Sequence, residues 1–230
     1  MNNFPEVGII ILAAIVHATL QLGSGCLLLL YHASLGKHIR KRTKSLVSSY
    51  IAGSGLMVLL GISLFYLAIA GIYGQTLSVG CLTVAAGAMV VLAILMWFVY
   101  YRRGKTTELW LPKVVAKFIT KRAEVTESNT EAFSLGMLSG FAEVPFTFVL
   151  MAVAANSLLS LQLGWQVVLA VVYVVIAVLP LVLMRLMIRR GKTVVDVQKW
   201  RVKNKTFLRI ISGATFAVLA MFIIAFKVMK

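Results

Sequence analysis

Six long apolar stretches occupy most of this 230-residue chain. They cover about residues 7–31, 46–71, 77–101, 132–156, 164–187 and 207–227. A helix needs roughly 20 apolar residues to cross the hydrocarbon core of a bilayer, so each stretch is long enough to span. In lipid the backbone must satisfy its own hydrogen bonds, and the short alternating segments of a transmembrane barrel are absent. The sequence therefore predicts an all-α, polytopic membrane protein with six transmembrane helices.

The composition excludes the other broad classes. Hydrophobic residues make up 60% of the chain and charged residues 13%, and the mean hydropathy is +0.94. Soluble domains have about half apolar and a quarter charged residues, so this chain is neither a soluble domain nor a disordered one. Six spans leave no room for a second folded unit, and we expect residues 1–230 to form a single membrane domain.

The basic residues are distributed unevenly along the chain. Lysine and arginine total 23 against 7 acidic residues, a formal net charge of +16, and all but two of the basic residues lie within 37–44, 102–122 and 185–209. These are the first, third and fifth connections between the apolar stretches. By the positive-inside rule they face the cytoplasm, and both termini then face outward. We expect this basic charge to meet anionic lipid headgroups, not nucleic acid.

The order of the segments suggests an inverted repeat. Three spans, about 5–101, precede a basic cytoplasmic loop, 102–130, and three more spans follow, about 131–230. Because three is odd, the second half has the opposite orientation, as in many secondary transporters, whose binding site lies near the midplane between the repeats. Within the loop, residues 110–122 alternate apolar and lysine-bearing faces, which predicts a short interfacial helix, either a lipid sensor or a plain connector. Ser128 and Glu131 predict a cap for the helix that follows.

Two ionisable residues lie deep inside the predicted spans. His17 and Glu143 are near the middle of the first and fourth stretches, and buried ionisable groups in membranes are costly and usually functional. Gln21 and Ser24 follow His17 at helical spacing and share its face, while Thr147 shares the face of Glu143. We expect Glu143 to carry the coupling charge and the other four side chains to line the site. We also expect His17 and Glu143 to approach one another across the repeat interface. The alternative to a functional site is a purely structural His17–Glu143 pair.

A helix break is predicted beside the buried acid. Pro145 follows Glu143 by two residues, removes a backbone N–H and disfavours helical geometry before it. Gly136 and Gly140 form a small-xxx-small pattern that permits a close approach by a neighbouring helix. Broken helices at the midplane are typical of transporter ion sites. By contrast, we assign Tyr173 in the fifth stretch to packing.

The remaining chemistry is sparse. Cys26 and Cys81 both lie in spans and form no Cys-x-x-Cys motif, and no haem, phosphate-loop or dinucleotide-binding pattern occurs. One buried histidine and one buried acid are too few for a metal site. We therefore expect no cofactor, no metal and no enzymatic activity.

The layout resembles the superfamily of the lysine exporter (LysE) and the DsbD/CcdA-type membrane proteins. The resemblance rests on two three-helix units, the basic loop between them and the break motif from Gly140 to Pro145. It implies export of a small solute or ion. The sequence departs from the pattern in helix 1, where those families tend to have a proline motif, and it lacks the CcdA-type cysteine pair, which argues against electron transfer through thiols.

These observations lead to one expected function and two alternatives. We expect a secondary transporter, an exporter of a small solute or ion, in a bacterial-type inner or plasma membrane. A non-transporting accessory or assembly protein and a membrane enzyme acting on lipid-linked substrates remain open. A homodimer is compatible with the sequence.

Overall fold

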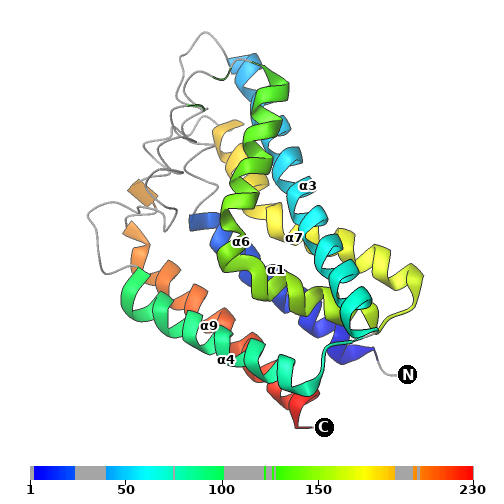
Figure 1. The fold of residues 1–230 in the computed structure, drawn as a ribbon. Helices are drawn as coiled ribbons and strands as arrows, with labels where there is room; N and C mark the ends of the chain where they lie inside the picture. The colour runs from blue at the N-terminus through cyan, green and yellow to red at the C-terminus, as the bar shows by residue number, and fades with distance from the viewer. Residues whose placement is uncertain are drawn as a thin grey trace.

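The computed structural model describes residues 3–23, 40–74, 76–100, 122, 126, 128–189, 199–200 and 203–229. Within these residues every regular element is a helix. The order is α1 (Phe4–Gly23), α3 (Arg40–Tyr73), α4 (Val79–Leu95) continued by the π-helix η2 (Met96–Tyr100), α6 (Asn129–Leu159), α7 (Leu163–Arg189) and α9 (Lys205–Ile223) continued by the π-helix η3 (Ile224–Val228). Figure 1 shows these helices in one bundle.

The helices coincide with the apolar stretches of the sequence. Five of them are long and apolar enough to cross a membrane: α1, α3, α4 with η2, α7 and α9 with η3. The sixth, α6, passes the same test only as two arms, Asn129–Phe141 and Glu143–Leu159, joined at a bend of 71°. The all-helical fold with apolar spans is that of an integral membrane protein. For the first stretch, residues 24–31 lie outside the described residues, as does most of the predicted interfacial helix.

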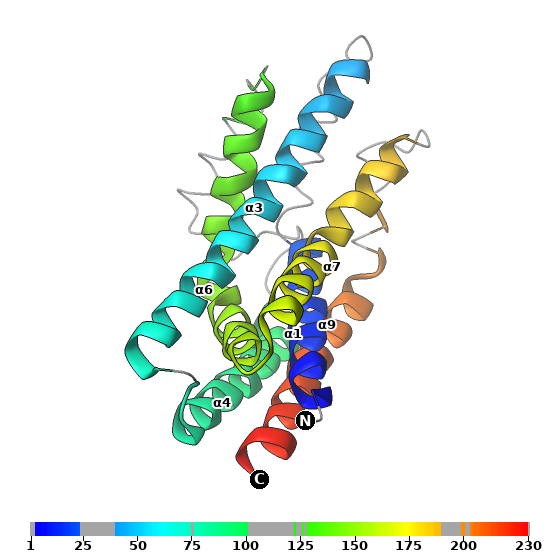
Figure 2. The same cartoon turned by 90° about the vertical axis from the view of Figure 1, so that its right-hand side faces the viewer.

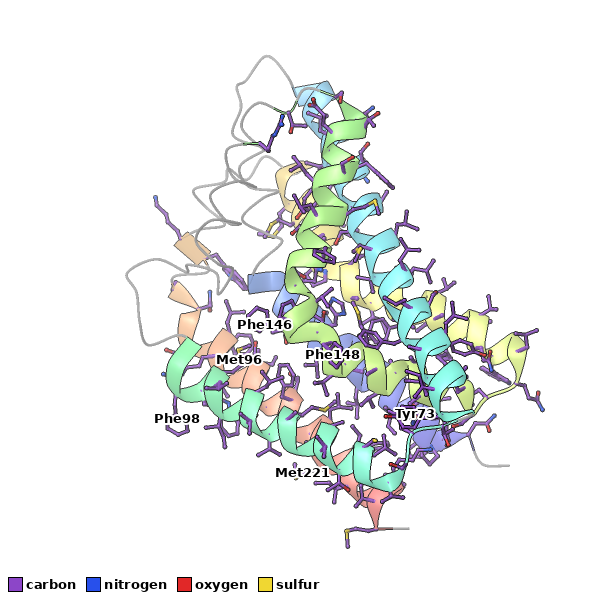
Figure 3. All side chains as sticks on the ribbon, viewed as in Figure 1. Tyr73, Met96, Phe98, Phe146, Phe148 and Met221 are labelled. Atoms are coloured by element: carbon purple, nitrogen blue, oxygen red, sulfur yellow. The ribbon has the colours of Figure 1, made fainter. Side chains whose placement is uncertain are left out.

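Large apolar side chains cover the outside of the bundle. Leu64, Leu67 and Val84 expose 66%, 67% and 74% of their surfaces, and similar side chains project from most helices in Figure 3. Water would make so much exposed apolar surface unfavourable, whereas lipid tails accept it.

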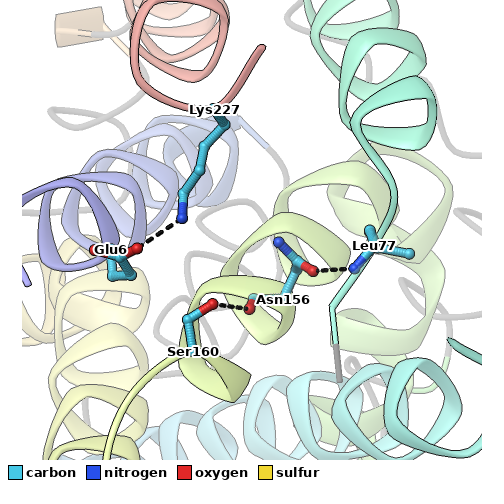
Figure 4. Close-up of polar contacts among 5 residues, drawn as sticks. All are labelled: Glu6, Leu77, Asn156, Ser160 and Lys227. Atoms are coloured by element: carbon cyan, nitrogen blue, oxygen red, sulfur yellow. Dashed lines mark hydrogen bonds and ion pairs between the residues drawn. The ribbon is translucent and has the colours of Figure 1, made fainter. Parts of the chain in front are cut away.

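Both termini lie at the same end of the bundle. The α3–α4 and α6–α7 connections are at that end too, and the helix ends that adjoin the basic connections of α3, α6 and α7 lie opposite (Figures 1 and 2). An ion pair joins the termini, with 2.6 Å between Lys227 Nζ and Glu6 Oε1 (Figure 4). The helix ends that adjoin the basic connections thus lie at one end of the bundle and the uncharged connections lie at the other, as the charge pattern predicts.

Side-chain caps fix the starts of two helices. Ser128 Oγ accepts a hydrogen bond from Glu131 N at 3.1 Å, which confirms the predicted N-terminal cap of α6. Ser78 Oγ accepts from Cys81 N at the start of α4. Just before it, Leu77 N donates to the buried Asn156 Oδ1 at 2.6 Å (Figure 4), so the end of α6 holds the turn that leads into α4.

The closest helix contact is between α3 and α6, and glycines form it. A Cβ built on Gly136 would overlap the backbone carbonyl of Tyr50, and one built on Gly53 would overlap the carbonyl of Phe133. Gly140 lies against Met57, one turn farther along both helices. The small-xxx-small pattern of Gly136 and Gly140 therefore does what the sequence predicts: it brings two backbones together.

Candidate functional site

The bend in α6 occurs where the sequence predicts a break. The two arms meet at Ala142, next to Glu143 and three residues before Pro145. Proline has no N–H, so Pro145 cannot bond to the carbonyl of Phe141 four residues earlier, and its ring crowds that carbonyl. The missing hydrogen bond makes bending easy at this position. Glu143 therefore lies at the bend, near the middle of a 31-residue helix.

Glu143 is buried and meets α1 through Gln21. The Glu143 side chain is 4% exposed and that of Gln21 is 1% exposed. Gln21 Nε2 donates a hydrogen bond to Glu143 Oε2 at 2.8 Å. A hydrogen bond to a carboxylate is among the stronger ones because the acceptor is charged, and burial strengthens it further. The structure thus brings together two of the predicted site residues, from helices 122 positions apart in sequence.

His17 lies one helical turn before Gln21 and bonds to α7. Its Nδ1 and the Tyr173 hydroxyl are 3.1 Å apart, and their rings stack edge to face with centroids 5.8 Å apart. Both side chains are fully buried. The assignment of Tyr173 to packing was therefore incomplete, because this tyrosine also carries the hydrogen bond of His17. No sequence signal links residues so far apart, although a tyrosine among the otherwise aliphatic residues 167–179 is a hint.

Thr147 completes the polar segment of α6. It is fully buried, and its Oγ1 donates to the carbonyl oxygen of Glu143 at 3.2 Å. Such a bond to the carbonyl four residues earlier often bends helices, so Thr147 acts on the backbone of the bend. Gly136 and Gly140 lie on the first arm against α3, as described above. Ser24, the last predicted site residue, lies outside the described residues.

The site consists of two polar contacts that join α1 to α7 and α1 to α6. Tyr173 of α7 meets His17 of α1, and Gln21 of α1 meets Glu143 of α6. The buried apolar core contributed by the same three helices includes Ala13, Ala14, Leu150, Ala154 and Ala177. No group of three or more histidine, cysteine, aspartate or glutamate side chains that could hold a metal occurs in the part of the chain that the structure describes. The chemistry of the site is that of one carboxyl group and the hydrogen-bonding partners of that group.

Comparison with known proteins adds no assignment. The chain matches no protein-family model, no curated protein and no solved structure.

Proposed function

We propose that this protein is a secondary transporter that moves a small solute or ion across a bacterial-type inner membrane, as an exporter, with Glu143 as the coupling carboxyl group. The observation that carries the proposal is the buried Glu143 at the bend of α6, held by Gln21 of α1. An acid in the interior of an apolar bundle is expensive to keep, and a broken helix is a structure on which transporters build ion sites.

The pattern of helix contacts supports two inverted repeats. Exchanging α1 with α6, α3 with α7 and α4 with α9 turns the α1–α7 contact into the α6–α3 contact, and α1–α9 into α6–α4. The α1–α6, α3–α7 and α4–α9 contacts map onto themselves. The paired contacts differ in extent, because α3–α6 is larger than α1–α7 and α1–α9 is larger than α4–α6, and the small α6–α7 contact has no counterpart of its size among the described residues. Under such a twofold relation, Gln21 and Glu143 would lie on the two helices that meet at the repeat axis.

The proposed mechanism is an exchange of charge at Glu143. A carboxyl group that faces opposite sides of the membrane in turn can take up a cation on one side and release it on the other. The bend at Pro145 gives α6 two arms, and a change in their angle would change the side from which Glu143 is reached. The basic connections are proposed to face the cytoplasm, with both termini outward.

The test is a flux measurement on the Glu143→Gln variant. Wild-type and variant proteins are reconstituted in liposomes with an internal pH dye, and a panel of basic amino acids and inorganic cations is offered under an imposed pH gradient. Glutamine keeps the shape and hydrogen bonding of glutamate but cannot carry a charge, so we expect substrate-coupled proton or cation flux to be lost. Melting in detergent should stay close to that of the wild type.

The matched control is Glu131→Gln, the same change at the exposed start of the same helix. This variant should keep wild-type flux. Full coupled flux in Glu143→Gln would refute the transport role of Glu143. A large loss of thermal stability in that variant would instead favour the accessory-protein alternative, in which the buried polar contacts serve helix packing.

A further inference from the structure

One buried polar atom beside Glu143 has no hydrogen-bonding partner. The Gln21 amide donates through Nε2 to Glu143 Oε2, but its oxygen, Oε1, is buried and accepts no hydrogen bond in the part of the chain that the structure describes. The whole side chain is 1% exposed. A buried acceptor without a donor is unfavourable, and such atoms call for a specific explanation. Oε1 belongs to the same planar amide that already touches the carboxyl group, so a donor on Glu143 would be close to it.

We propose that Gln21 and Glu143 form a closed pair with two hydrogen bonds when Glu143 is protonated, and that the coupling ion is therefore a proton. An ionised carboxylate only accepts, whereas a protonated one also donates through its O–H. The second carboxyl oxygen of Glu143 would donate to Gln21 Oε1 while Oε2 continues to accept from Nε2. The terminal torsions of glutamate and glutamine have broad minima, so the required rotation is small. This inference rests on the proposed transport function and deepens it.

The proton balance is simple. A proton from water on one side binds the carboxylate, an O–H bond forms, and Glu143 becomes neutral as Gln21 Oε1 gains its donor. On release the O–H bond breaks, the proton returns to water on the other side, and Oε1 is unpaired again. Gln21 thus makes one hydrogen bond to the protonated form that the ionised form lacks.

The buried titratable groups on the neighbouring helices are the other candidates for carrying the proton. Among the described residues, the buried titratable side chains on the helices packed against α6 are His17 on α1, Tyr50 on α3 and Tyr173 on α7, and His17 is bonded to Tyr173. A hard metal ion such as Ca²⁺ takes about six to eight oxygen ligands. The described site has one carboxyl group and one free amide oxygen, so a proton fits it better than a metal ion.

The experiment is infrared difference spectroscopy of the purified protein in lipid nanodiscs during a pH titration. We expect acid to produce a protonated-carboxyl C=O band that is absent from Glu143→Gln. In Gln21→Met, which keeps length but has no hydrogen-bonding groups, the band should move to higher wavenumber because the acid loses its hydrogen bonds to Gln21. The control Gln166→Met removes a glutamine near the start of α7 that accepts a hydrogen bond from Tyr66. This variant should leave the band unchanged.

Three results would overturn the inference. The first is an unchanged band in Gln21→Met, and the second is the absence of a titrating band at any pH where the protein is folded. The third is loss of the band when Na⁺ replaces an organic cation at constant pH, because that loss would assign the site to a metal ion.

If Gln21→Met does not fold, wild-type protein with ¹³C-labelled glutamine side chains replaces it. One labelled amide band should then fall in wavenumber on acidification, and not in Glu143→Leu; no such shift refutes the pair. Since the spectra need no substrate, failure of the pair and failure of transport are separate results.

Discussion

A single methyl group at Gly136 should destabilise the bundle, although alanine is the better helix former. A Cβ at this position would overlap the carbonyl of Tyr50 and would come 2.9 Å from Ser54 N. Both obstacles are backbone atoms of α3, which cannot rotate away as a side chain can. The helices must therefore move apart until the methyl reaches ordinary contact, a shift of more than about 1 Å. A gap of about 0.5–1 Å already forfeits a quarter to a half of the dispersion energy of each affected contact.

The magnitude follows from two opposing terms. Overpacking a tight interface costs about 1–3 kcal/mol and sometimes more, and the upper end applies here because backbone is the obstacle. Replacing glycine by alanine inside a helix returns about 1 kcal/mol. We expect a net loss of about 2 kcal/mol for Gly136→Ala. The matched control is Gly87→Ala on α4, where a Cβ meets nothing within 4 Å; it should be neutral or stabilising by up to about 1 kcal/mol.

The assay is reversible unfolding in mixed micelles, followed by far-ultraviolet circular dichroism as the denaturing detergent fraction rises. A Cβ at Gly53 would overlap the carbonyl of Phe133 across the same interface, so Gly53→Ala should destabilise the bundle in the same way. One separation of the helices relieves both clashes, so the double variant should cost less than the sum of the single ones. Equal stability of Gly136→Ala and Gly87→Ala would refute the close approach of α3 and α6.

Two further predictions concern the end of the bundle that holds the termini. Asn156→Leu leaves Leu77 N without its acceptor and should cost about 1–3 kcal/mol in the same unfolding assay, whereas Ser160→Ala, which removes a 3.4 Å bond, should have little effect. In a background without native cysteines, a membrane-impermeant maleimide added to intact cells should label a cysteine placed at Gln162 and not one at Lys41; labelling at Lys41 alone would invert the proposed topology.

The positions of the helices could be predicted because they depend on local properties of the chain. Length and apolarity fix a span. The boundaries of α6 and α7 differ from the predicted ones by at most three residues, whereas α3 begins six residues before the predicted start. The bend in α6 was predictable for the same reason, since Pro145 acts on the turn that precedes it. The glycine contact could be expected in kind, but the sequence could not identify α3 as the partner helix.

The polar partners were beyond sequence analysis. Whether His17 meets Glu143 or Tyr173 depends on the rotation of three helices about their axes, and packing of many apolar side chains sets that rotation. A pair of ionisable residues at equal depth suggested direct contact. The structure instead gives His17 a partner on α7 and leaves Gln21, one turn away, to meet Glu143. Rotation about the axis of α1 decides between these arrangements, and depth alone does not.

Contacts with a neighbouring helix hold the bend of α6, so the bend angle in this structure does not depend on the charge of Glu143. Pro145 lowers the resistance of the helix to bending but does not set the direction. Contacts with α3 occur on both arms: Gly136 lies on Tyr50 before the bend, and after it the rings of Phe148 and Phe65 meet edge to face with centroids 4.7 Å apart. In this conformation, contacts on both sides of the weak point hold the angle, so the carboxyl group is not needed to maintain it. The bend should therefore survive neutralisation of Glu143, so that a change in flux without a change in stability can be attributed to the lost charge.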